Sequence, residues 1–585
     1  MSVVDGVLRV LAPLAEKVDR SAGWDRLPPK LGIFALLSLR QRLRDRNLYD
    51  TRRPVPVRLP GNVAEERSGM RRLDGSWNDA RDPQMGARLT PFGRNAPPQD
   101  ERAAPYTPPA REVSEQLLTR HDFFPAETLN LLAAAWIQFE VHDWFAHRTG
   151  DYEKGDLEVP DGVPANPRPL VRGRDLDCDY ARFISDQTHW WDASQLYGAD
   201  PSFADAIRTG ESGMVLEDEA LLLVMEKHLD RFDGTTAAIP NLWLGTALIH
   251  VIFAKEHNEI CRSLAKTHPR HKRDDKWLFE KARLINAAVM AKIHTVEWTP
   301  AVVGHPASAD GARKTWYGLL PAYREPLKRF HQEVLTGLPG SRLNLDGAPY
   351  ALTEEFVAVY RMHQLIPDAV TFVGENGPRP IDQLTVAPGD AGKSLPREAL
   401  KAIGCANAIR SLAKAFPGEI TLHNHPQFLQ RFRPRDDAPL LDLGMIDILR
   451  TRETGVPRYN AFRRLFRLEP AATFHDVANG NPKWAKEIRD VYNGELEAVD
   501  LLIGMFAERK PRGFAFSDTA FRVFLLMATR RLRSDRFFTT DYTPEVYTPE
   551  GLKWIDDATF SKVIARHYRE LESELPAGNP FTPWT

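Results

Sequence analysis

The sequence predicts a mainly α-helical fold with few short strands. From about residue 116 onward, apolar residues recur at the three- and four-residue spacing of helices, and alternating β-branched runs are few. The chain has 585 residues and a mass of 66.2 kDa, which is more than one hydrophobic core usually holds. We therefore expect either two domains or one large helical body.

The helical pattern is clearest in a series of segments spread along the chain. These segments are 126–147, 217–231, 242–266, 275–298, 323–336, 351–364, 396–414, 484–507 and 517–531. Polar loops that contain proline are expected at 150–175 and 377–394. The pattern divides the chain into an N-terminal helical segment (1–50), an extended arm rich in proline and glycine (51–115) and a main body (116–585).

The N-terminal segment allows two interpretations. Valines and leucines recur at helical spacing within residues 3–17, which predicts an amphipathic helix. Its apolar face could dock on the body of the protein, or it could rest on a membrane surface. The basic run Arg40–Arg46 gives some support to peripheral membrane contact.

The start of the chain predicts neither secretion nor a membrane span. Asp5 and Arg9 interrupt the apolar core that a signal peptide needs, and Leu31–Leu39 is too short to cross a bilayer. We therefore expect a cytoplasmic protein, with peripheral membrane contact as a possibility.

Composition excludes some classes of protein. The net charge is −2, and the basic residues are scattered among acidic ones, which argues against nucleic-acid binding. The three cysteines, Cys178, Cys261 and Cys405, are far apart in sequence. Their odd number and wide spacing fit a reducing compartment and provide no cysteine metal cluster.

Gln138 and His142 lie four residues apart, on one face of the helix expected at 126–147. The rest of that helix is apolar, so both polar groups are expected to be buried and to need partners. A histidine satisfied inside the core is the alternative. Asp143 points about a quarter-turn away and could serve a different site.

Tyr360 and His363 form a second polar pair, three residues apart in the helix expected at 351–364, which Pro367 ends. A neutral imidazole can ligate haem iron, and a phenol one turn away could lose an electron to an oxidised iron centre. The alternative is a tyrosine and a histidine packed in the core. Taken with Gln138 and His142, the pair suits a buried haem that does oxidative chemistry.

Residues 188–194 place Thr188, Trp190, Asp192 and Ser194 at alternate positions, so that in an extended loop they project to one side. Three of them supply side-chain oxygens, and Trp190 could supply its carbonyl. Completed by Asp143, this hard-oxygen set would suit Ca²⁺. Ordinary turn hydrogen bonds are the alternative, because the same residue types favour turns.

A third group of polar residues could bind a carboxylate. His294 and Thr299 lie near the end of the helix expected at 275–298, and Arg530 and Arg531 end the helix expected at 517–531. An arginine with a histidine and a threonine can give charge-assisted hydrogen bonds to a carboxylate. Surface ion pairs, or charges that complement a helix dipole, are the alternatives.

Together these segments resemble a known superfamily. Gln-x-x-x-His-Asp at 138–143, the 188–194 loop, Lys-Glu-His-Asn at 255–258 and Tyr-Asn-Ala-Phe-Arg-Arg at 459–464 occur in the order expected of animal-type haem peroxidases (the peroxidase–cyclooxygenase superfamily). His-Asp-Trp at 142–144, Tyr-Arg-Met-His at 360–363 and the stretch 530–540 look like its fatty acid α-dioxygenase branch. The likeness covers about residues 120–560 and is looser over the first 50. It implies a large helical, cyclooxygenase-like body.

The resemblance implies roles for the haem-side residues. His142 matches the distal histidine, with Gln138 beside it, and His363 matches the proximal iron ligand. Asn460 would accept the hydrogen bond from the outer ring nitrogen of His363. Tyr360 matches the tyrosine that becomes the catalytic radical.

The resemblance also implies a substrate site and a calcium site. His294, Thr299 and Arg531 match the residues that hold the substrate carboxylate, with Arg530 as the neighbouring alternative to Arg531. The implied calcium ligands are Asp143, Thr188, Trp190, Asp192 and Ser194.

The implied activity is addition of O₂ at C2 of a long-chain fatty acid through a tyrosyl radical, after activation by a peroxide, to give a 2-hydroperoxy fatty acid. Val141 replaces the aspartate that esterifies the haem in mammalian secreted peroxidases, so haem b should bind without covalent links. A general haem peroxidase that oxidises small phenols with hydrogen peroxide is the nearest alternative. A haem- or lipid-binding protein without turnover and a calcium-dependent structural protein are more distant ones.

Overall fold

The computed structural model of the protein describes residues 3–51, 69–99, 107–148, 170, 182–230, 243–320, 333–374, 377–381, 396–431 and 441–584. The loop expected at 150–175, apart from residue 170, and most of the helix expected at 323–336 lie outside the described residues.

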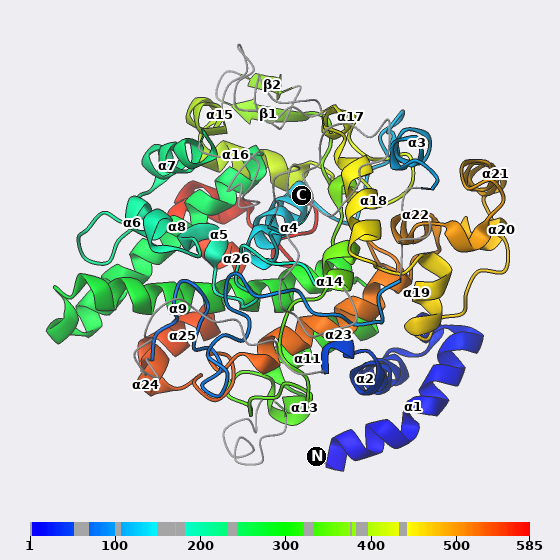
Figure 1. Ribbon diagram of the computed structural model, residues 1–585. Helices are drawn as coiled ribbons and strands as arrows, with labels where there is room; N and C mark the ends of the chain where they lie inside the picture. Colours follow the sequence, from blue (N-terminus) through cyan, green and yellow to red (C-terminus); the bar gives the residue numbers. More distant parts are fainter. Residues whose placement is uncertain are drawn as a thin grey trace.

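The described chain is mainly helical, as predicted (Figure 1). As far as residue 317 the elements are α1 (Val3–Ala22), η1 (Trp24–Arg26), α2 (Pro29–Arg46), η2 (Tyr49–Thr51), α3 (Ala110–Val113), η4 (Ser114–Leu118), α4 (Leu131–Trp144), α5 (Ser194–Tyr197), α6 (Pro201–Ile207), α7 (Asp218–Asp230), α8 (Leu244–Thr267), η6 (Pro269–His271), α9 (Asp275–Ile293), η7 (His294–Trp298), α10 (Thr299–Val302) and α11 (Pro306–Tyr317).

The remaining elements follow from residue 333 onward. They are α13 (Glu333–Thr336), α14 (Glu354–Val359), η9 (His363–Leu365), β1 (Val370–Gly374), β2 (Gly377–Ile381), α15 (Pro396–Ile403), α16 (Cys405–Lys414), α17 (Gln427–Gln430), α18 (Leu443–Glu453), α19 (Tyr459–Leu465), α20 (Phe474–Val477), α21 (Pro482–Val491), η10 (Leu496–Ala498), α22 (Leu501–Ala507), α23 (Asp518–Ser534), α24 (Pro544–Tyr547), α25 (Pro549–Asp557), α26 (Phe560–His567) and η11 (Arg569–Glu574).

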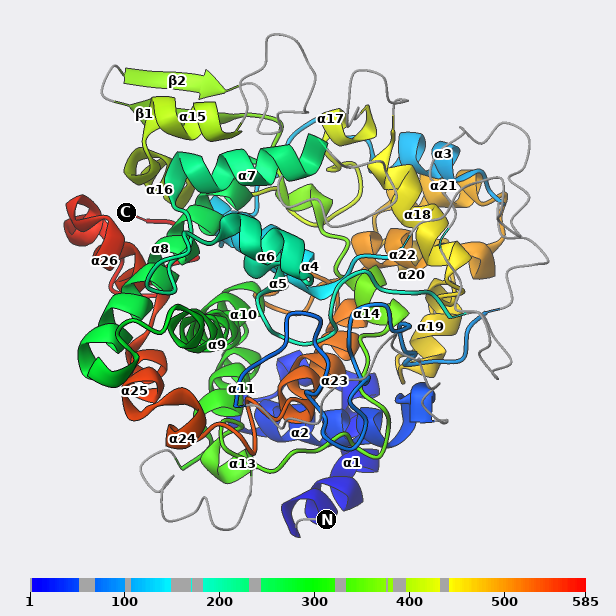
Figure 2. The ribbon, with the colours of Figure 1, turned by 60° about the vertical axis from the view of Figure 1, so that its left-hand side comes forward.

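Strands are few among the described residues. β1 and β2 form an antiparallel pair in which Val370 lies opposite Ile381. The first residues of the stretch expected to be a loop at 377–394 are therefore strand β2. The sheet lies at one edge of the molecule beside α15 and α16, away from the helical core (Figure 2).

The core is built around α4, which packs against α8, α5 and α16. Most residues of α4 are apolar, and its leucines and alanines are almost completely buried. A helix that is apolar on nearly all sides is stable only when other elements enclose it. The polar groups of α4 are therefore held in fixed positions inside the protein.

Several predicted helices begin or end elsewhere, for local reasons. The expected helix 126–147 begins only after Asn130, whose side chain donates to the Pro580 carbonyl at 2.8 Å. The expected helix 396–414 is divided at Gly404, whose φ of 80° is not helical. The segment 484–507 is divided in the same way by Gly494, with a φ of 80°.

The prediction of one continuous helix over 351–364 is wrong. α14 ends at Val359, and Tyr360 is its C-terminal cap. Met362, with φ −120° and ψ 37°, turns the chain before His363 begins the 3₁₀ turn η9. Tyr360 and His363 therefore do not share a helical face, and each meets different neighbours.

The arm expected over residues 51–115 is described in part. Residues 69–99 contain isolated bridges but no helix, whereas the end of the arm forms the helical turns α3 and η4. The arm is partly buried: Asn95 donates its backbone N–H to Glu355 at 2.8 Å and accepts from the Thr353 hydroxyl at 2.6 Å. These bonds hold the start of α14, the helix that leads to Tyr360.

The Lys-Glu-His-Asn segment of α8 joins distant parts of the chain. Glu256 is fully buried, accepts from Trp554 Nε1 at 2.9 Å and lies 2.8 Å from His567 Nε2. Asn258 bonds to both the N–H and the carbonyl of Val215, each at 2.8 Å. This segment therefore stabilises the fold and takes no part in the site described below.

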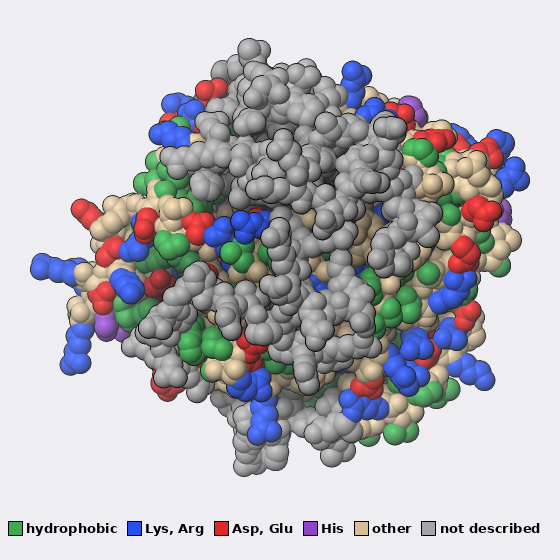
Figure 3. All heavy atoms as spheres, viewed as in Figure 1, with side chains coloured by type: hydrophobic (Ala, Val, Ile, Leu, Met, Phe, Trp, Pro, Cys, Tyr) green, Lys and Arg blue, Asp and Glu red, His purple; other side chains and the backbone are tan. Residues whose placement is uncertain are grey.

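Basic and acidic side chains are interspersed over the described part of the face shown in Figure 3. Within the described chain, no helix has both the length and the apolar character that crossing a membrane requires.

Candidate functional site

His142 and Gln138 meet on α4, as their spacing predicted. The Gln138 amide nitrogen lies 3.4 Å from His142 Nε2. Both side chains keep partial exposure on a helix that is mostly buried. A histidine beside an amide donor, with access to a bound molecule, can move protons to and from a peroxide.

His363 has a different partner from the expected one. Its Nδ1 lies 2.8 Å from Asp447 Oδ2 on α18, so the ring can donate to a carboxylate. Burial acts to raise the pKa of Asp447, but the nearby His363 and Arg361 outweigh it and lower that pKa. The carboxylate therefore stays charged and leaves Nε2 of His363 for a metal.

Asn460 does not contact His363, so its expected role is corrected. Its amide nitrogen donates to the Ala471 carbonyl and to Glu497, each at 3.0 Å, and its amide oxygen accepts from Ala471 N–H at 2.8 Å. Through these bonds Asn460 fixes the position of Ala471, in the segment that follows α19. The sequence did contain a signal for Asp447, because a carboxylate between Met445 and Ile448 in an apolar stretch needs a buried partner.

His425 lies beside the His363–Asp447 pair. Its ring centroid is 5.7 Å from that of His363, and one ligand atom from each of the three side chains lies within 4.8 Å of the others. Burial, followed by the charge of His363, lowers the pKa of His425 to about 3, so this ring is neutral. The sequence provided no signal that pointed to His425.

Tyr360 is buried among aromatic rings. Its ring lies 4.5 Å from that of Phe356 and 5.1 Å, edge to face, from that of Trp144. Burial raises the pKa of the Tyr360 phenol well above its ordinary value. The phenol is therefore protonated at neutral pH and can give up a hydrogen atom.

His294 lies in η7, a single π-helical turn between α9 and α10. Such turns are often found at functional sites. Nδ1 of His294 accepts from Trp136 Nε1 at 3.2 Å, so the ring proton is on Nε2. Burial, and then the charge of Arg531, lower the pKa of His294 well below its ordinary value, which keeps the ring a neutral donor.

Arg531 lies between two tryptophans. Its guanidinium carbon is 4.9 Å from the ring centroid of Trp144 and 4.8 Å from that of Trp191. Nη2 donates to the Trp190 carbonyl at 3.1 Å, whereas Nε and Nη1 are buried and have no hydrogen-bond partner among the described residues. Each of these N–H groups could donate a charge-assisted hydrogen bond to a carboxylate.

Arg530 is directed elsewhere. It donates to the Pro349 carbonyl and lies 3.7 Å from Asp50. Of the two neighbouring arginines, Arg531 is the one that contacts the aromatic residues around Tyr360 and His294.

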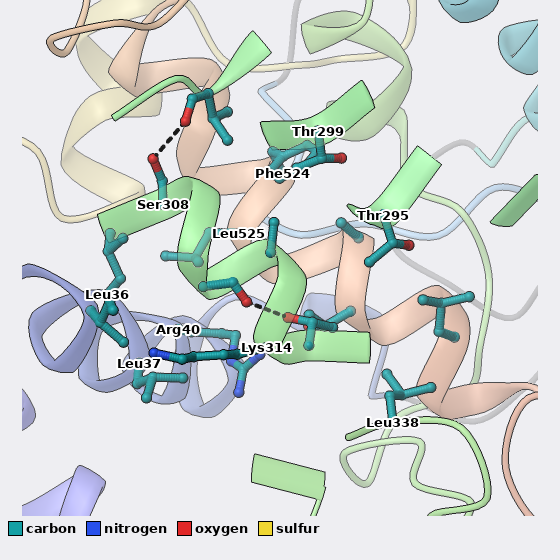
Figure 4. Close-up of a pocket in the computed structure, with 18 of the residues that line it drawn as sticks. Leu36, Leu37, Arg40, Thr295, Thr299, Ser308, Lys314, Leu338, Phe524 and Leu525 are labelled. Atoms are coloured by element: carbon teal, nitrogen blue, oxygen red, sulfur yellow. Dashed lines mark hydrogen bonds between the residues drawn. The ribbon is translucent and has the colours of Figure 1, made fainter. Parts of the chain in front are cut away.

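An apolar cavity begins at this site (Figure 4). It has a volume of about 110 Å³, and His294, Thr299 and Trp191 form part of its wall. The other walls come from α2, α11 and α23, and include Leu36 and Phe524. Such a cavity can hold an aliphatic chain whose polar end is bound at His294 and Thr299.

The loop 188–194 meets α4 as expected. Ser194 donates its N–H to Asp143 at 2.7 Å and its hydroxyl at 3.0 Å, and Thr188 donates to Asp192 at 2.9 Å. Burial, then the nearby Asp192, raise the pKa of Asp143. Two close carboxylates without full hydrogen bonding fit a bound cation, since one oxygen of each accepts no hydrogen bond from the described residues.

The calcium set shares groups with the substrate set. The Trp190 carbonyl accepts from Arg531, and Arg531 Nη2 lies 3.8 Å from Asp143 Oδ2. The structure places His294, Tyr360 and Arg531 around Trp144, and Asp143 between Ser194 and Arg531, whereas Asn460 bonds elsewhere.

The family model for animal haem peroxidases matches residues 70–581. Alpha-dioxygenase 1 of Arabidopsis thaliana is 32% identical to this chain. The match covers 100% of this chain and 93% of that protein. The fatty acid alpha-dioxygenase structure from Arabidopsis thaliana has a TM-score of 0.86 and 31% identity over 100% of this chain and 93% of that one.

A structure of Oryza sativa fatty acid alpha-dioxygenase, a tyrosine-to-phenylalanine variant with palmitic acid, has a TM-score of 0.84 and 30% identity. The match covers 100% of this chain and 97% of that chain. The chain belongs to the animal haem peroxidase family and, within it, to the alpha-dioxygenases, a group of haem oxidoreductases.

Proposed function

We propose that the protein is a fatty acid α-dioxygenase, which adds O₂ to C2 of a long-chain fatty acid to give a 2-hydroperoxy acid. One observation carries this proposal: Tyr360, His294 and Arg531 all surround the ring of Trp144. A carboxylate bound by His294 and Arg531 would therefore place the adjacent carbon near Tyr360. The relatives named above, including the rice enzyme studied with palmitic acid, support this assignment.

We propose that haem b binds between α4 and η9. His363, oriented by Asp447, would hold the iron through Nε2, and His142 with Gln138 beside it would move the proton of the activating peroxide. When bound, haem activated by a peroxide supplies the oxidising power that removes one electron and one proton from Tyr360. Val141 cannot form an ester, so the haem would be non-covalent, and denaturation should release it intact.

The reaction at the substrate then depends on position. The Tyr360 radical takes one hydrogen atom from C2, which breaks a C–H bond and forms the phenol O–H bond. O₂ adds to the carbon radical, and the peroxyl radical takes the hydrogen atom back from Tyr360. Because the carboxylate is held in place, only the carbon next to it is presented to Tyr360.

The test is oxygen uptake by the haem-loaded protein, started with palmitic acid and a trace of peroxide. We expect uptake and a 2-hydroperoxy product, because the proposed abstraction needs no double bond. If the protein instead only oxidises small phenols with hydrogen peroxide, it is a general peroxidase and the proposal is wrong.

Substitution of Arg531 by alanine should mainly weaken substrate binding. Loss of a buried charged partner typically costs about 2–5 kcal/mol, which raises the dissociation constant by roughly 30-fold or more. Palmitate binding measured by calorimetry checks this. Arg533→Gln on the same helix, which faces Asp346, is the control and should bind normally. Normal palmitate affinity in Arg531→Ala would remove the residue from the carboxylate site.

We also propose that Ca²⁺ binds Asp143, Thr188, Trp190, Asp192 and Ser194, supported by the buried oxygens described above. Removal of Ca²⁺ by a chelator should lower the melting temperature, since two buried carboxylates lose their counter-ion, and added Ca²⁺ should restore it. Asp192→Asn should respond to neither treatment. A wild-type melting temperature unaffected by complete chelation would contradict the site.

We propose further that α1 and α2 contact a membrane surface peripherally, on the cytoplasmic side. Val10 is 78% and Leu14 60% exposed on α1, and Figures 1 and 2 place this helix at the edge of the molecule. Leu31 on α2, close to the residues that line the cavity, is also exposed. Wild type should sediment with lipid vesicles, and Val10→Asp with Leu14→Asp should reduce this several-fold. Equal sedimentation of wild type and the double variant would show that this face of α1 does not bind the membrane.

A further inference from the structure

Tyr360 is in contact with side chains that could drain its radical. The ring of Trp144 lies 5.1 Å from that of Tyr360, and the ring of Trp191 lies 5.5 Å from that of Trp144. Indole and phenol side chains are oxidised with similar ease, and contact distances allow rapid electron transfer. Without some opposing effect, the radical formed on Tyr360 would move to the tryptophans. It would then no longer be available to react with the substrate.

Arg531 provides an opposing effect on both rings. Its guanidinium carbon lies 4.9 Å from the ring centroid of Trp144 and 4.8 Å from that of Trp191. A neutral indole is attracted to a cation over its face, whereas an indole that has lost an electron is itself positive and is repelled. Trp144, Trp191 and Arg531 are all buried, so water screens this repulsion only weakly. Oxidation of either ring is therefore disfavoured.

The other route, loss of the indole proton, is also closed. An oxidised indole can become neutral by giving its Nε1 proton to an acceptor. Trp136 has such an acceptor, the His294 ring, whose Nδ1 lies 3.2 Å from Trp136 Nε1. Nε1 of Trp144 and of Trp191 is buried without a hydrogen-bond partner among the described residues. The cation radicals of the two tryptophans that contact Arg531 therefore cannot lose the Nε1 proton to become neutral radicals.

We propose that Arg531 confines the unpaired electron to Tyr360 by keeping Trp144 and Trp191 reduced. This inference rests on the proposed function, because it requires a radical on Tyr360. The step that Arg531 suppresses moves one electron from Trp144 to the Tyr360 radical. Trp144 is oxidised to a cation radical, and Tyr360 is reduced to a phenolate that then takes a proton from water. Formation of the Tyr360 radical itself leaves a neutral side chain, so the guanidinium opposes it far less.

The test is electron paramagnetic resonance of the haem-loaded protein, frozen soon after hydrogen peroxide is added without fatty acid. Samples carry ring-deuterated tyrosine or ring-deuterated tryptophan, so that the radical can be assigned. In wild type, deuterated tyrosine should narrow the signal and Tyr360→Phe should remove it. In Arg531→Gln, deuterated tryptophan should change the signal. Arg531→Lys, which keeps the charge, should retain the tyrosine signal.

Peptide mass spectrometry of the same samples gives a second measurement. Oxygenated Trp144 and Trp191 should increase several-fold in Arg531→Gln over wild type, with Trp298 as the internal control. Replacement of Trp144 and Trp191 by phenylalanine in the Arg531→Gln protein should restore the tyrosine signal.

The possible failures can be told apart. A tyrosine signal alone in Arg531→Gln, with no added tryptophan oxidation, would overturn the confinement and leave the proposed function intact. A wild-type protein without a Tyr360 signal would overturn both. If Arg531→Gln does not fold, Trp144→Phe in the wild-type background decides. Its tyrosine signal should equal that of wild type, and a stronger signal would show that Trp144 takes the radical from Tyr360 even beside Arg531, which contradicts the proposal.

Discussion

Tyr360→Phe should abolish oxygen uptake with palmitic acid while leaving haem binding unchanged. The substitution removes one oxygen atom from a ring that stays packed against Phe356 and Trp144. Because the phenol is the group that would take the hydrogen atom from C2, no other part of the side chain can replace it. The absorption spectrum of the bound haem and oxygen uptake, measured on the same sample, test this directly.

A matched control separates this loss from a general effect of removing a buried hydroxyl. Tyr547 is also buried, and its hydroxyl donates to the Phe537 carbonyl at 2.9 Å. Tyr547→Phe should therefore keep its oxygenase turnover, even if it lowers stability by about 1 kcal/mol. Full turnover in Tyr360→Phe would show that the hydrogen atom is removed by another group.

His363→Ala should lose the haem or strongly perturb its ligation. The alanine variant has no nitrogen to offer the iron, and it leaves Asp447 as a buried carboxylate without its histidine. The expected result is a much weaker or displaced Soret band on titration with haem. Added imidazole should restore part of it by filling the space of the lost ring.

The neighbouring residues provide the controls for this ligand assignment. His425→Ala should still bind haem, since His425 lies beside the pair and is not the proposed ligand. Asp447→Asn should keep the ligand but raise the reduction potential of the iron, because a neutral partner makes the imidazole less basic. Normal haem ligation in His363→Ala, together with loss of ligation in His425→Ala, would show that His425 rather than His363 ligates the iron.

Local sequence patterns were sufficient to predict some parts of the site. The apolar run around residues 131–144 can be stable only as an enclosed helix, and four-residue spacing places Gln138 beside His142 on it. The residues from Thr188 to Ser194 form a loop that leads into α5, in which Thr188 donates to Asp192 and Ser194 to Asp143. The Gln138–His142 and Thr188–Asp192 pairs are each only four residues apart in sequence.

Other parts of the prediction were wrong because a helix ended where the sequence pattern continued. The periodic pattern over 351–364 has no proline or glycine before Pro367, so nothing in it showed that α14 ends at Val359. The packing of Tyr360 against Trp144 and the bond from His363 to Asp447 determine where the chain turns. Tertiary contacts of this kind outweigh the small helical propensities of single residues.

The sequence by itself thus determined the helical class, the residue types of the site and, through its resemblance, the family. Only the tertiary structure decided that Asp447 rather than Asn460 orients His363, a choice between partners 84 and 97 residues away along the chain. It alone also placed Arg531 between Trp144 and Trp191, which lie on separate segments. The physical reason is that helix and loop periodicities act over a few residues, whereas these contacts depend on where the whole fold places α4, α18 and α23.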